Sequence, residues 1–183
     1  MPSIYLAGPE VFLPDAVEIG RRKQQLCAAY GFEGLYPLDN EISAAGTERT
    51  DKLIYDANKE MIARCDIGIC NLTPFRGPGA DAGTVFELGL MAGLGKAVFA
   101  YTNDAADYAH RVESFAPGSA KHLRDPHGMT VEDFGNFDNL MLEWAVRESC
   151  GHPVVRHAAA AADLYRDLTG FEQCLRLAAA RPR

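Results

Sequence analysis

The sequence has no excess of positive charge and no long apolar run, and each absence excludes a class of protein. The 183 residues carry a net charge of -7, which argues against an electrostatic nucleic-acid-binding protein because such proteins present a basic face. No apolar run is long enough to span a bilayer, and residues 1–12 lack the basic and apolar regions of a signal peptide. We therefore expect a cytoplasmic protein with neither nucleic-acid nor membrane partners.

The five cysteines and five histidines also lack the patterns of metal sites and disulfide frameworks. The cysteine count is odd and no C-x-x-C pair occurs, so we expect buried free thiols in a reducing compartment. The histidines do not have the spacing of metal ligands, and we expect no metal site. The chain has neither a G-x-S-x-G motif nor a P-loop.

What the sequence does contain is an alternation of short apolar segments with amphipathic ones. Strands are predicted over residues 3–7, 32–36, 66–72 and 96–101, and helices over 14–30, 50–64 and 84–94. In the first helix, Val17, Leu26 and Ala29 are expected to face inward. The alternation predicts an α/β fold, a doubly wound parallel sheet with helices on both faces. The length favours one domain over residues 1–183.

The second half of the chain has a weaker pattern. Residues 102–138 form a long polar connection, which in a compact domain is usually a lid or an interface loop. A helix is predicted over 139–149, which ends a core of about residues 1–150. An Ala-rich C-terminal helix is predicted over about 157–180, and it is expected to pack on the sheet or on a neighbouring subunit. Its inward face would hold Leu164, Leu168, Phe171, Leu175 and Ala178.

The most informative segment is the Gly-rich turn that leads into the third helix. It places Asp81 and Glu87 after the strand at 66–72, at the carboxyl end of a parallel sheet, where α/β proteins bind ligands. Two neighbouring carboxylates suit the chemistry of glycosidic bonds, one as the nucleophile and the other as the general acid. Gly79 and Gly83 would let the backbone come close to a ligand.

Each of these side chains also has an ordinary structural interpretation. Thr84 and Glu87 match the S/T-x-x-E capping box, in which the glutamate only satisfies a backbone N–H at the helix start. Asp81 fits a turn aspartate that bonds its own backbone. Tyr5 could orient Glu87 by a hydrogen bond if the first and third strands are neighbours, as in a flavodoxin-like order; otherwise it is a core tyrosine.

Two further segments follow strands at the same end of the sheet. Asp39 and Asn40 come after the second strand and either recognise a ligand or belong to an ordinary polar loop over 38–49. Phe75 comes after the third strand, where its ring could stack on a planar base. Arg76 next to it could lie at the rim of such a site.

Together these segments resemble the nucleoside 2-deoxyribosyltransferase family. The matching segments are residues 4–12, 36–41, 65–68, 72–77, 81–89, 94–96 and 138–142, so the resemblance spans about residues 4–142. It implies a flavodoxin-like (Rossmann-like) domain, with extra C-terminal helices here, that moves 2-deoxyribose between nucleobases. The partners would be 2′-deoxynucleosides and free nucleobases, and no metal or organic cofactor is required.

The resemblance also implies roles for individual residues. Glu87 would be the nucleophile, Tyr5 would orient it, and Asp81 would protonate the departing base and later deprotonate the incoming one. Asn139 matches a position that an adjacent subunit contributes, so the protein would be a homo-oligomer, at least a dimer. The other substrate-binding positions would be Gly8, Asp39, Asn40, Phe75 and Gly83, followed by Glu10, Phe12, Asn58 and Met141. Asn58 falls near the place where some members carry an active-site Asp.

A carboxylate nucleophile would give a covalent glycosyl-enzyme and a retained configuration. The nearest alternative is an N-glycoside hydrolase on the same fold, in which water replaces the acceptor base. The turn at 8–10 offers an acid rather than a phosphate cradle, which disfavours a nucleotide substrate. A non-catalytic nucleoside-binding sensor is the third possibility, and the pairing of Asp81 with Glu87 speaks against it.

Overall fold

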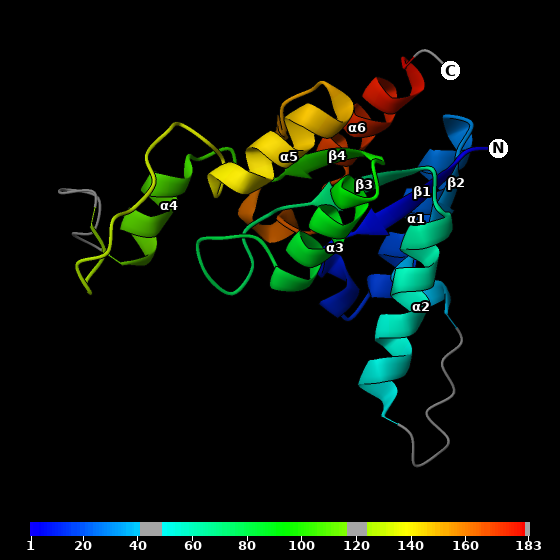
Figure 1. Ribbon diagram of the computed structural model, residues 1–183, viewed down its shortest axis with the longest axis horizontal. Coiled ribbons are helices and arrows are strands. Elements are labelled where there is room, and N and C mark those ends of the chain that lie inside the picture. The colour runs from blue at the N-terminus through cyan, green and yellow to red at the C-terminus, as the bar shows by residue number, and fades with distance from the viewer. Residues whose placement is uncertain (41–48, 117–123, 182–183) are drawn as a thin grey trace.

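A five-stranded parallel sheet forms the centre of the molecule (Figure 1). The structure is a computed structural model that describes residues 1–40, 49–116 and 124–181. The strands are β1 (Ser3–Ala7), β2 (Glu33–Leu35), β3 (Ile67–Asn71), β4 (Ala97–Thr102) and β5 (Val155–Arg156). Their order is β2-β1-β3-β4-β5 and every neighbouring pair is parallel. This is the flavodoxin-like order, with β1 beside β3, so the predicted fold class is confirmed.

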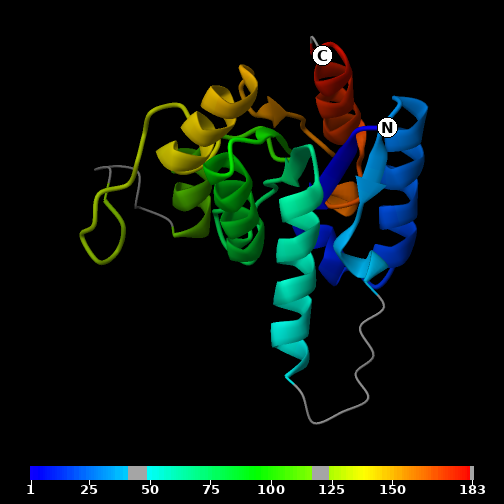
Figure 2. The same cartoon turned by 45° about the vertical axis from the view of Figure 1, so that its right-hand side comes forward.

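Helices cover both faces of the sheet (Figure 2). On one face lie α1 (Ala16–Ala29) and α6 (Thr169–Ala179), and on the other lie α2 (Thr50–Arg64), α3 (Ala82–Gly93) and α5 (Leu140–Cys150). Because both faces are covered, β1, β3 and β4 are almost entirely buried. The short helix α4 (Tyr108–Phe115) projects away from the sheet, at the left of Figure 1. It packs in a small separate cluster formed by Tyr108, Ala109, Val112 and Val131.

The inward face of α1 differs from the predicted one. Val17 is 74% exposed and Ala29 is also exposed, while Leu26 is partly buried against the core. The buried face instead consists of Ala16, Ile19, Gly20, Lys23 and Cys27. A stripe that contains a glycine and a lysine is not recognised by hydrophobic periodicity, because that lysine is buried through a partner elsewhere in the sequence.

The predicted C-terminal helix over 157–180 is wrong in its first half, since α6 begins at Thr169. The preceding segment extends the sheet as β5, and its backbone then continues along β4: the N–H groups of His157 and Ala159 donate to the carbonyls of Thr102 and Asn103. Tertiary hydrogen bonds therefore override the helix propensity of the alanine run. Within α6 the expected inward face is largely confirmed, with Phe171, Leu175 and Ala178 buried and Leu168, just before it, buried as well.

The connection over 102–138 was expected to be irregular but contains the eight-residue helix α4. Whether this segment acts as a lid or an interface loop stays a prediction. The predicted loop over 38–49 falls mostly outside the described residues. A short 3-10 helix, η1 (Pro9–Phe12), follows β1, and another, η2 (Pro37–Asp39), follows β2; a third, η4 (Ala161–Asp163), precedes α6.

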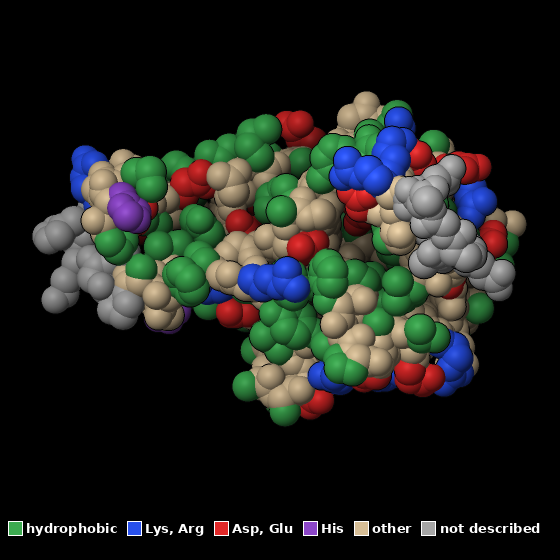
Figure 3. Space-filling model, turned by 90° about the horizontal axis from the view of Figure 1, so that it is seen from below, with side chains coloured by type: hydrophobic (Ala, Val, Ile, Leu, Met, Phe, Trp, Pro, Cys, Tyr) green, Lys and Arg blue, Asp and Glu red, His purple; other side chains and the backbone are tan. Residues whose placement is uncertain are grey.

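All five cysteines are buried free thiols, as expected. Within residues 1–40, 49–116 and 124–181, no helix is long and apolar enough to cross a membrane, and no cluster of three or more His, Cys, Asp or Glu side chains could hold a metal ion. Figure 3 shows Lys and Arg side chains interspersed with Asp and Glu on the face seen from below.

Candidate active site at the junction of β1 and β3

The side chains of Tyr5 and Glu87 meet across 82 positions of sequence. The Tyr5 hydroxyl, from β1, donates a 2.6 Å hydrogen bond to Oε1 of Glu87 on α3. The contact follows from the topology, since β1 lies beside β3 and α3 follows β3 and packs over both strands. The described residues make no hydrogen bond to the second carboxylate oxygen of Glu87, so it is available to a ligand.

The start of α3 tests the capping-box interpretation of Glu87. Asp81 is the N-cap residue, and its Oδ2 accepts hydrogen bonds from the backbone N–H of Thr84 at 2.9 Å and from the Thr84 hydroxyl at 3.0 Å. The helix therefore begins at Ala82, and Glu87 lies in its second turn. The capping-box interpretation of Glu87 is wrong, because Asp81 already caps this helix.

Asp81 thus has the structural role that the sequence left open, but only one of its oxygens is used. None of the described residues bonds Oδ1. Gly83 fits closely beside the cap, since a Cβ there would lie 3.1 Å from Oδ2. One oxygen therefore holds the side chain in place, while the other makes no hydrogen bond to the described residues.

Burial sets the ionisation of the pair. Desolvation raises the pKa of Glu87 from 4.5 to about 7, the charges of Asp81 and Glu10 add to the rise, and the hydrogen bond from Tyr5 opposes it. Burial and the nearby Glu87 charge raise the pKa of Tyr5 well above its ordinary value, so Tyr5 keeps its proton and remains a donor. Near neutral pH the Glu87 carboxyl is poised between its acid and its anion.

Aromatic rings lie beside the loops that follow β1 and β3. The rings of Phe12 and Phe75 are stacked, with centroids 5.3 Å apart and planes inclined by 12°. The Arg76 guanidinium lies 4.5 Å from the centroid of Phe75 and 5.3 Å from that of Phe12. Tyr165 completes the cluster: its ring meets Phe75 edge-on at 6.2 Å and its hydroxyl donates to the carbonyl of Pro74 at 2.5 Å.

The segment that carries Tyr165 is itself held firmly. Arg166 makes a bidentate ion pair with Asp15, at 2.8 and 2.9 Å, just before α1. The side-chain amide of Asn103 donates to the carbonyls of Leu164 and Asp167 at 2.8 and 2.9 Å. Sequence periodicity gave no sign of this arrangement, because these contacts join distant segments through single polar side chains.

The family model for nucleoside 2-deoxyribosyltransferases matches residues 4–141. The chain belongs to this family. A 2-deoxyribosyltransferase from Leishmania mexicana is 30% identical, with a TM-score of 0.65 over 90% of this chain and 95% of that one. An uncharacterized protein from Schizosaccharomyces pombe is 34% identical over 173 residues, which cover 85% of this chain and 82% of the relative. A conserved protein from Enterococcus faecalis V583, 19% identical with a TM-score of 0.56, shares the fold over 96% of this chain and 98% of its own.

Two of the residues expected to bind substrate, Gly8 and Glu10, lie at the start of η1, directly after β1. Glu10 is 0% exposed; it pairs with the buried Lys23 and accepts a 2.8 Å hydrogen bond from the amide of Asn71. A Cβ on Gly8 would lie 2.2 Å from a Glu10 oxygen. The Glu10 carboxylate thus belongs to a buried ion pair, and Gly8 makes room for it. A contact between Glu10 and the substrate stays a prediction.

Asp39, Asn40 and Asn58 lie at the β2 side of the site. Asp39 accepts hydrogen bonds at 2.8 Å from the backbone N–H of Tyr36 and from the side-chain amide of Gln24, so it caps η2 as well as facing solvent. The amide of Asn40 donates to the carbonyl of Pro37 at 3.2 Å and lies 3.5 Å from Oδ1 of Asn58. The structure thus brings together two asparagines that are 18 positions apart.

Asn139 and Met141 lie at the start of α5. The Asn139 side chain caps this helix by accepting from the N–H of Met141 at 3.0 Å, and it donates to Glu132 at 2.6 Å. The side chain of Met141 is 69% exposed, and Trp144, one turn further along α5, is also exposed. These two large apolar side chains lie on the helix that Asn139 caps.

Proposed function

We propose that the protein transfers 2-deoxyribose from one nucleobase to another through a covalent intermediate on Glu87. The main support is the 2.6 Å hydrogen bond between Tyr5 and Glu87. It fixes one carboxylate oxygen and leaves the other for the anomeric carbon of a deoxynucleoside. A nucleophile held in this way loses little orientational freedom in the transition state.

In the first half of the reaction, the free oxygen of Glu87 attacks C1′ of the sugar. The bond between C1′ and the base nitrogen breaks, its electron pair goes to the base, and Asp81 supplies the proton that neutralises the base. In the second half, an incoming base gives a proton to Asp81 and its nitrogen attacks C1′, which releases Glu87. Two inversions at C1′ retain the configuration.

The residues around this pair would hold the base and the sugar. Phe75 and Phe12 offer aromatic faces for the base, and Gly83 lets a ligand approach the start of α3. Asn40 and Asn58, with Asp39 beside them, offer amide and carboxylate groups for polar recognition. Gly8 and Glu10 would lie below the bound substrate, where the ion pair with Lys23 holds the Glu10 carboxylate.

Exposed apolar side chains on α3 and α5 support an oligomer of at least two subunits. Phe86, Leu94, Met141 and Trp144 are each more than half exposed, and large apolar surfaces of this kind commonly mark interfaces. In the oligomer, Asn139, with Met141 near it, would complete the pocket of the adjacent subunit. Sedimentation analysis tests the assembly. Mixing the inactive variants Glu87→Ala and Asn139→Ala tests the sharing, because a mixed dimer would regain one intact site.

The transfer itself is tested by incubating the protein with 2′-deoxyinosine, with and without adenine, and separating the products. We expect 2′-deoxyadenosine to form only when adenine is present. Hypoxanthine and free deoxyribose without a new nucleoside would instead indicate a hydrolase. Glu87→Ala should form no product, whereas Glu143→Gln, a change at a buried glutamate on α5, serves as the matched control that keeps activity.

The covalent step has a direct readout. After rapid denaturation during turnover, mass spectrometry should find the chain heavier by one 2-deoxyribosyl group, attached to the peptide that contains Glu87. Turnover without any such adduct, under conditions in which the first half-reaction is fast, would contradict the covalent route.

A further inference from the structure

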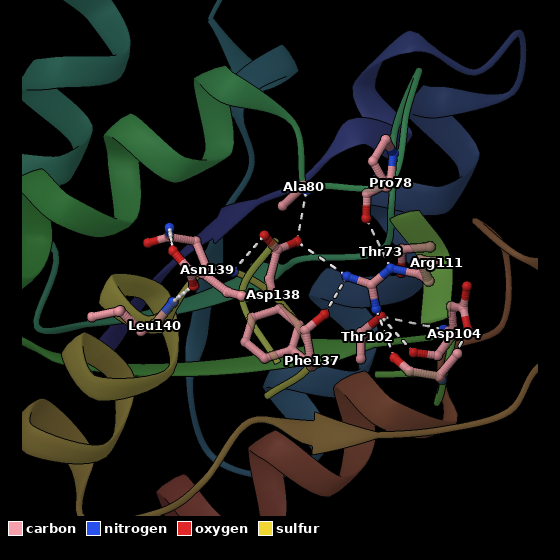
Figure 4. A network of polar contacts seen from close by, with 12 residues as sticks. Thr73, Pro78, Ala80, Thr102, Asp104, Arg111, Phe137, Asp138, Asn139 and Leu140 are labelled. Atoms are coloured by element: carbon pink, nitrogen blue, oxygen red, sulfur yellow. Dashed lines mark hydrogen bonds and ion pairs between the residues drawn. The ribbon is translucent and has the colours of Figure 1, made fainter. Parts of the chain in front are cut away.

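The guanidinium of Arg111, on α4, joins four segments of the chain (Figure 4). Its Nε donates to the carbonyl of Pro78 at 2.8 Å and its Nη1 to the carbonyl of Ala106 at 2.8 Å. Its Nη2 donates to the carbonyl of Phe137 and, at 3.2 Å, to Oδ2 of Asp138. The side chain is buried, and the two bonds made by Nη2 are buried with it.

Asp138 extends the same network in two directions. Its Oδ2, besides facing Arg111, accepts a 2.9 Å hydrogen bond from the backbone N–H of Ala80, the residue before Asp81. Its Oδ1 accepts a 2.8 Å hydrogen bond from the backbone N–H of Asn139. One buried carboxylate is therefore bonded to the residue before Asp81 and to the backbone of Asn139, and we assign roles in the reaction to both Asp81 and Asn139.

The segment held in this way would otherwise be loose. Between β3 and α3 the chain runs through Gly77, Pro78 and Gly79, and Arg76 has a left-handed backbone with φ of 57°. Glycines increase the conformations open to such a turn. A single internal backbone bond, from the N–H of Phe75 to the carbonyl of Gly79, crosses it among the described residues. The bonds to Pro78 and Ala80 lie on either side of Gly79 and fix the stretch that leads into Asp81.

We propose that Arg111 and Asp138 are positioning residues for proton transfer to the departing base. They act by holding the 78–80 turn, so that the free oxygen of Asp81 lies where the base nitrogen leaves. This inference rests on the proposed function, and it adds two residues to it. Neither residue touches the reacting atoms. Since a misplacement of about 1 Å can cost about a hundredfold in rate, a loosened turn should weaken the proton transfer specifically.

The test compares two donors that differ in their need for a proton. The base of 2′-deoxyinosine leaves with the electron pair of the C1′–N bond and must be protonated. The base of 7-methyl-2′-deoxyguanosine is already cationic, and the same electron pair neutralises it without any proton. Loss of Asp81 function should therefore slow the first donor far more than the second.

We expect Arg111→Lys to lower kcat/KM for 2′-deoxyinosine by about tenfold or more, and by no more than the ~10²–10⁴ that a general acid contributes in full. For 7-methyl-2′-deoxyguanosine, measured against an enzyme-free control, the loss should stay below about threefold. Asp138→Asn, which keeps the shape of the side chain, should show the same selectivity, and so should Asp81→Asn. Arg156→Lys is the matched control, because Arg156 ties the same projecting segment through Asp107 and the carbonyl of Gly135 without reaching the 78–80 turn.

Equal losses for the two donors in both the Arg111 and Asp138 variants would overturn the inference and leave only a structural role. Undiminished activity with 2′-deoxyinosine would overturn it as well. Should Arg111→Lys fail to fold, as judged by its circular dichroism, the Asp138→Asn variant decides the matter. A wild-type protein that releases base from neither donor would instead refute the proposed function. The two failures are distinguishable, because this one is seen in the wild type and the other only in the comparison of variants.

Discussion

Replacing Glu87 by glutamine should make the protein more stable at alkaline pH while removing its activity. The side chain keeps its size, and the glutamine oxygen can still accept the hydrogen bond from Tyr5. What disappears is a buried negative charge. Desolvation raises the pKa of Glu87 from 4.5 to about 7, which means that the folded protein resists the ionisation that the unfolded chain accepts readily.

The magnitude follows from that difference. A change of one in pKa corresponds to about 1.4 kcal/mol, so a rise from 4.5 to about 7 corresponds to about 3 kcal/mol. The sign is that of a raised carboxyl pKa: between these two values the folded state binds more protons than the unfolded state, so the free energy of unfolding falls as pH rises. The penalty is absent below pH 4.5 and complete above about pH 7.

Urea unfolding of both proteins at about pH 4.5 and about pH 8.5 measures the effect, because other titrating groups contribute equally and cancel in the difference. The advantage of Glu87→Gln over the wild type should grow by about 3 kcal/mol between the two conditions. Glu18→Gln, at an exposed position paired with Arg21, should show no comparable growth. A constant difference across the range would refute the reasoning, because Glu87 would then ionise as easily in the folded protein as in the unfolded chain.

Three further outcomes are expected. Transfer activity should rise with pH through about 7 as Glu87 ionises. Tyr5→Phe should move the midpoint of the pH–rate profile upward, because it removes the hydrogen bond that favours the Glu87 anion. An unchanged midpoint would speak against a role of that bond. Gly8→Ala should lower the free energy of unfolding by about 1–3 kcal/mol, since its Cβ would collide with the buried Glu10 carboxylate. Gly89→Ala in α3 has open space around it and should raise the free energy of unfolding by up to about 1 kcal/mol. Urea titration of both variants measures the two changes. Tyr165→Phe should lower the free energy of unfolding by about 1 kcal/mol and raise KM for the donor, because the loop beside Phe75 loses an anchor; an unaltered KM would separate this anchor from substrate binding.

Strands β1 to β4 were predictable because they are apolar runs bounded by turn residues, and that signal is local. The two-residue strand β5 was not predicted. The neighbourhood of β1 and β3 then followed from the rules of parallel α/β folds. For the same reason the meeting of Tyr5 with Glu87 was accessible from the sequence, given the order of the strands.

The start of α3 was less accessible. Both Asp81 and Thr84 are good N-cap residues, and the sequence offers the second with a glutamate at the right distance. The structure uses Asp81 instead, with the Thr84 hydroxyl as an additional donor to the same oxygen. Capping preferences alone cannot choose between two suitable residues three positions apart, because the choice depends on the backbone path of the turn that precedes the helix.

Long-range polar contacts were not predictable at all. Arg111 lies in a polar stretch that carries no motif, and its significance comes from carbonyl groups of segments up to 33 positions away. Lys23 is similar: it is buried on α1 because it meets Glu10 and lies over the rings of Tyr101 and Phe171. A hydropathy pattern shows that a side chain is charged, but it does not show whether the folded protein supplies a buried partner for that charge.

The clasp formed by Asn103, Tyr165 and Arg166 has a consequence for how the protein is made. A nascent chain that has released β1 through α3 from the ribosome already carries Tyr5, Asp81 and Glu87. The contacts that tie the loops after β1 and β3 to the C-terminal part of the chain form only when Arg166 reaches Asp15 and Tyr165 reaches Pro74. The two carboxylates that we propose as nucleophile and acid are therefore synthesised early, while the residues that anchor the loops after β1 and β3 are synthesised late. The nascent chain thus passes through a stage in which both carboxylates are present before those loops are anchored.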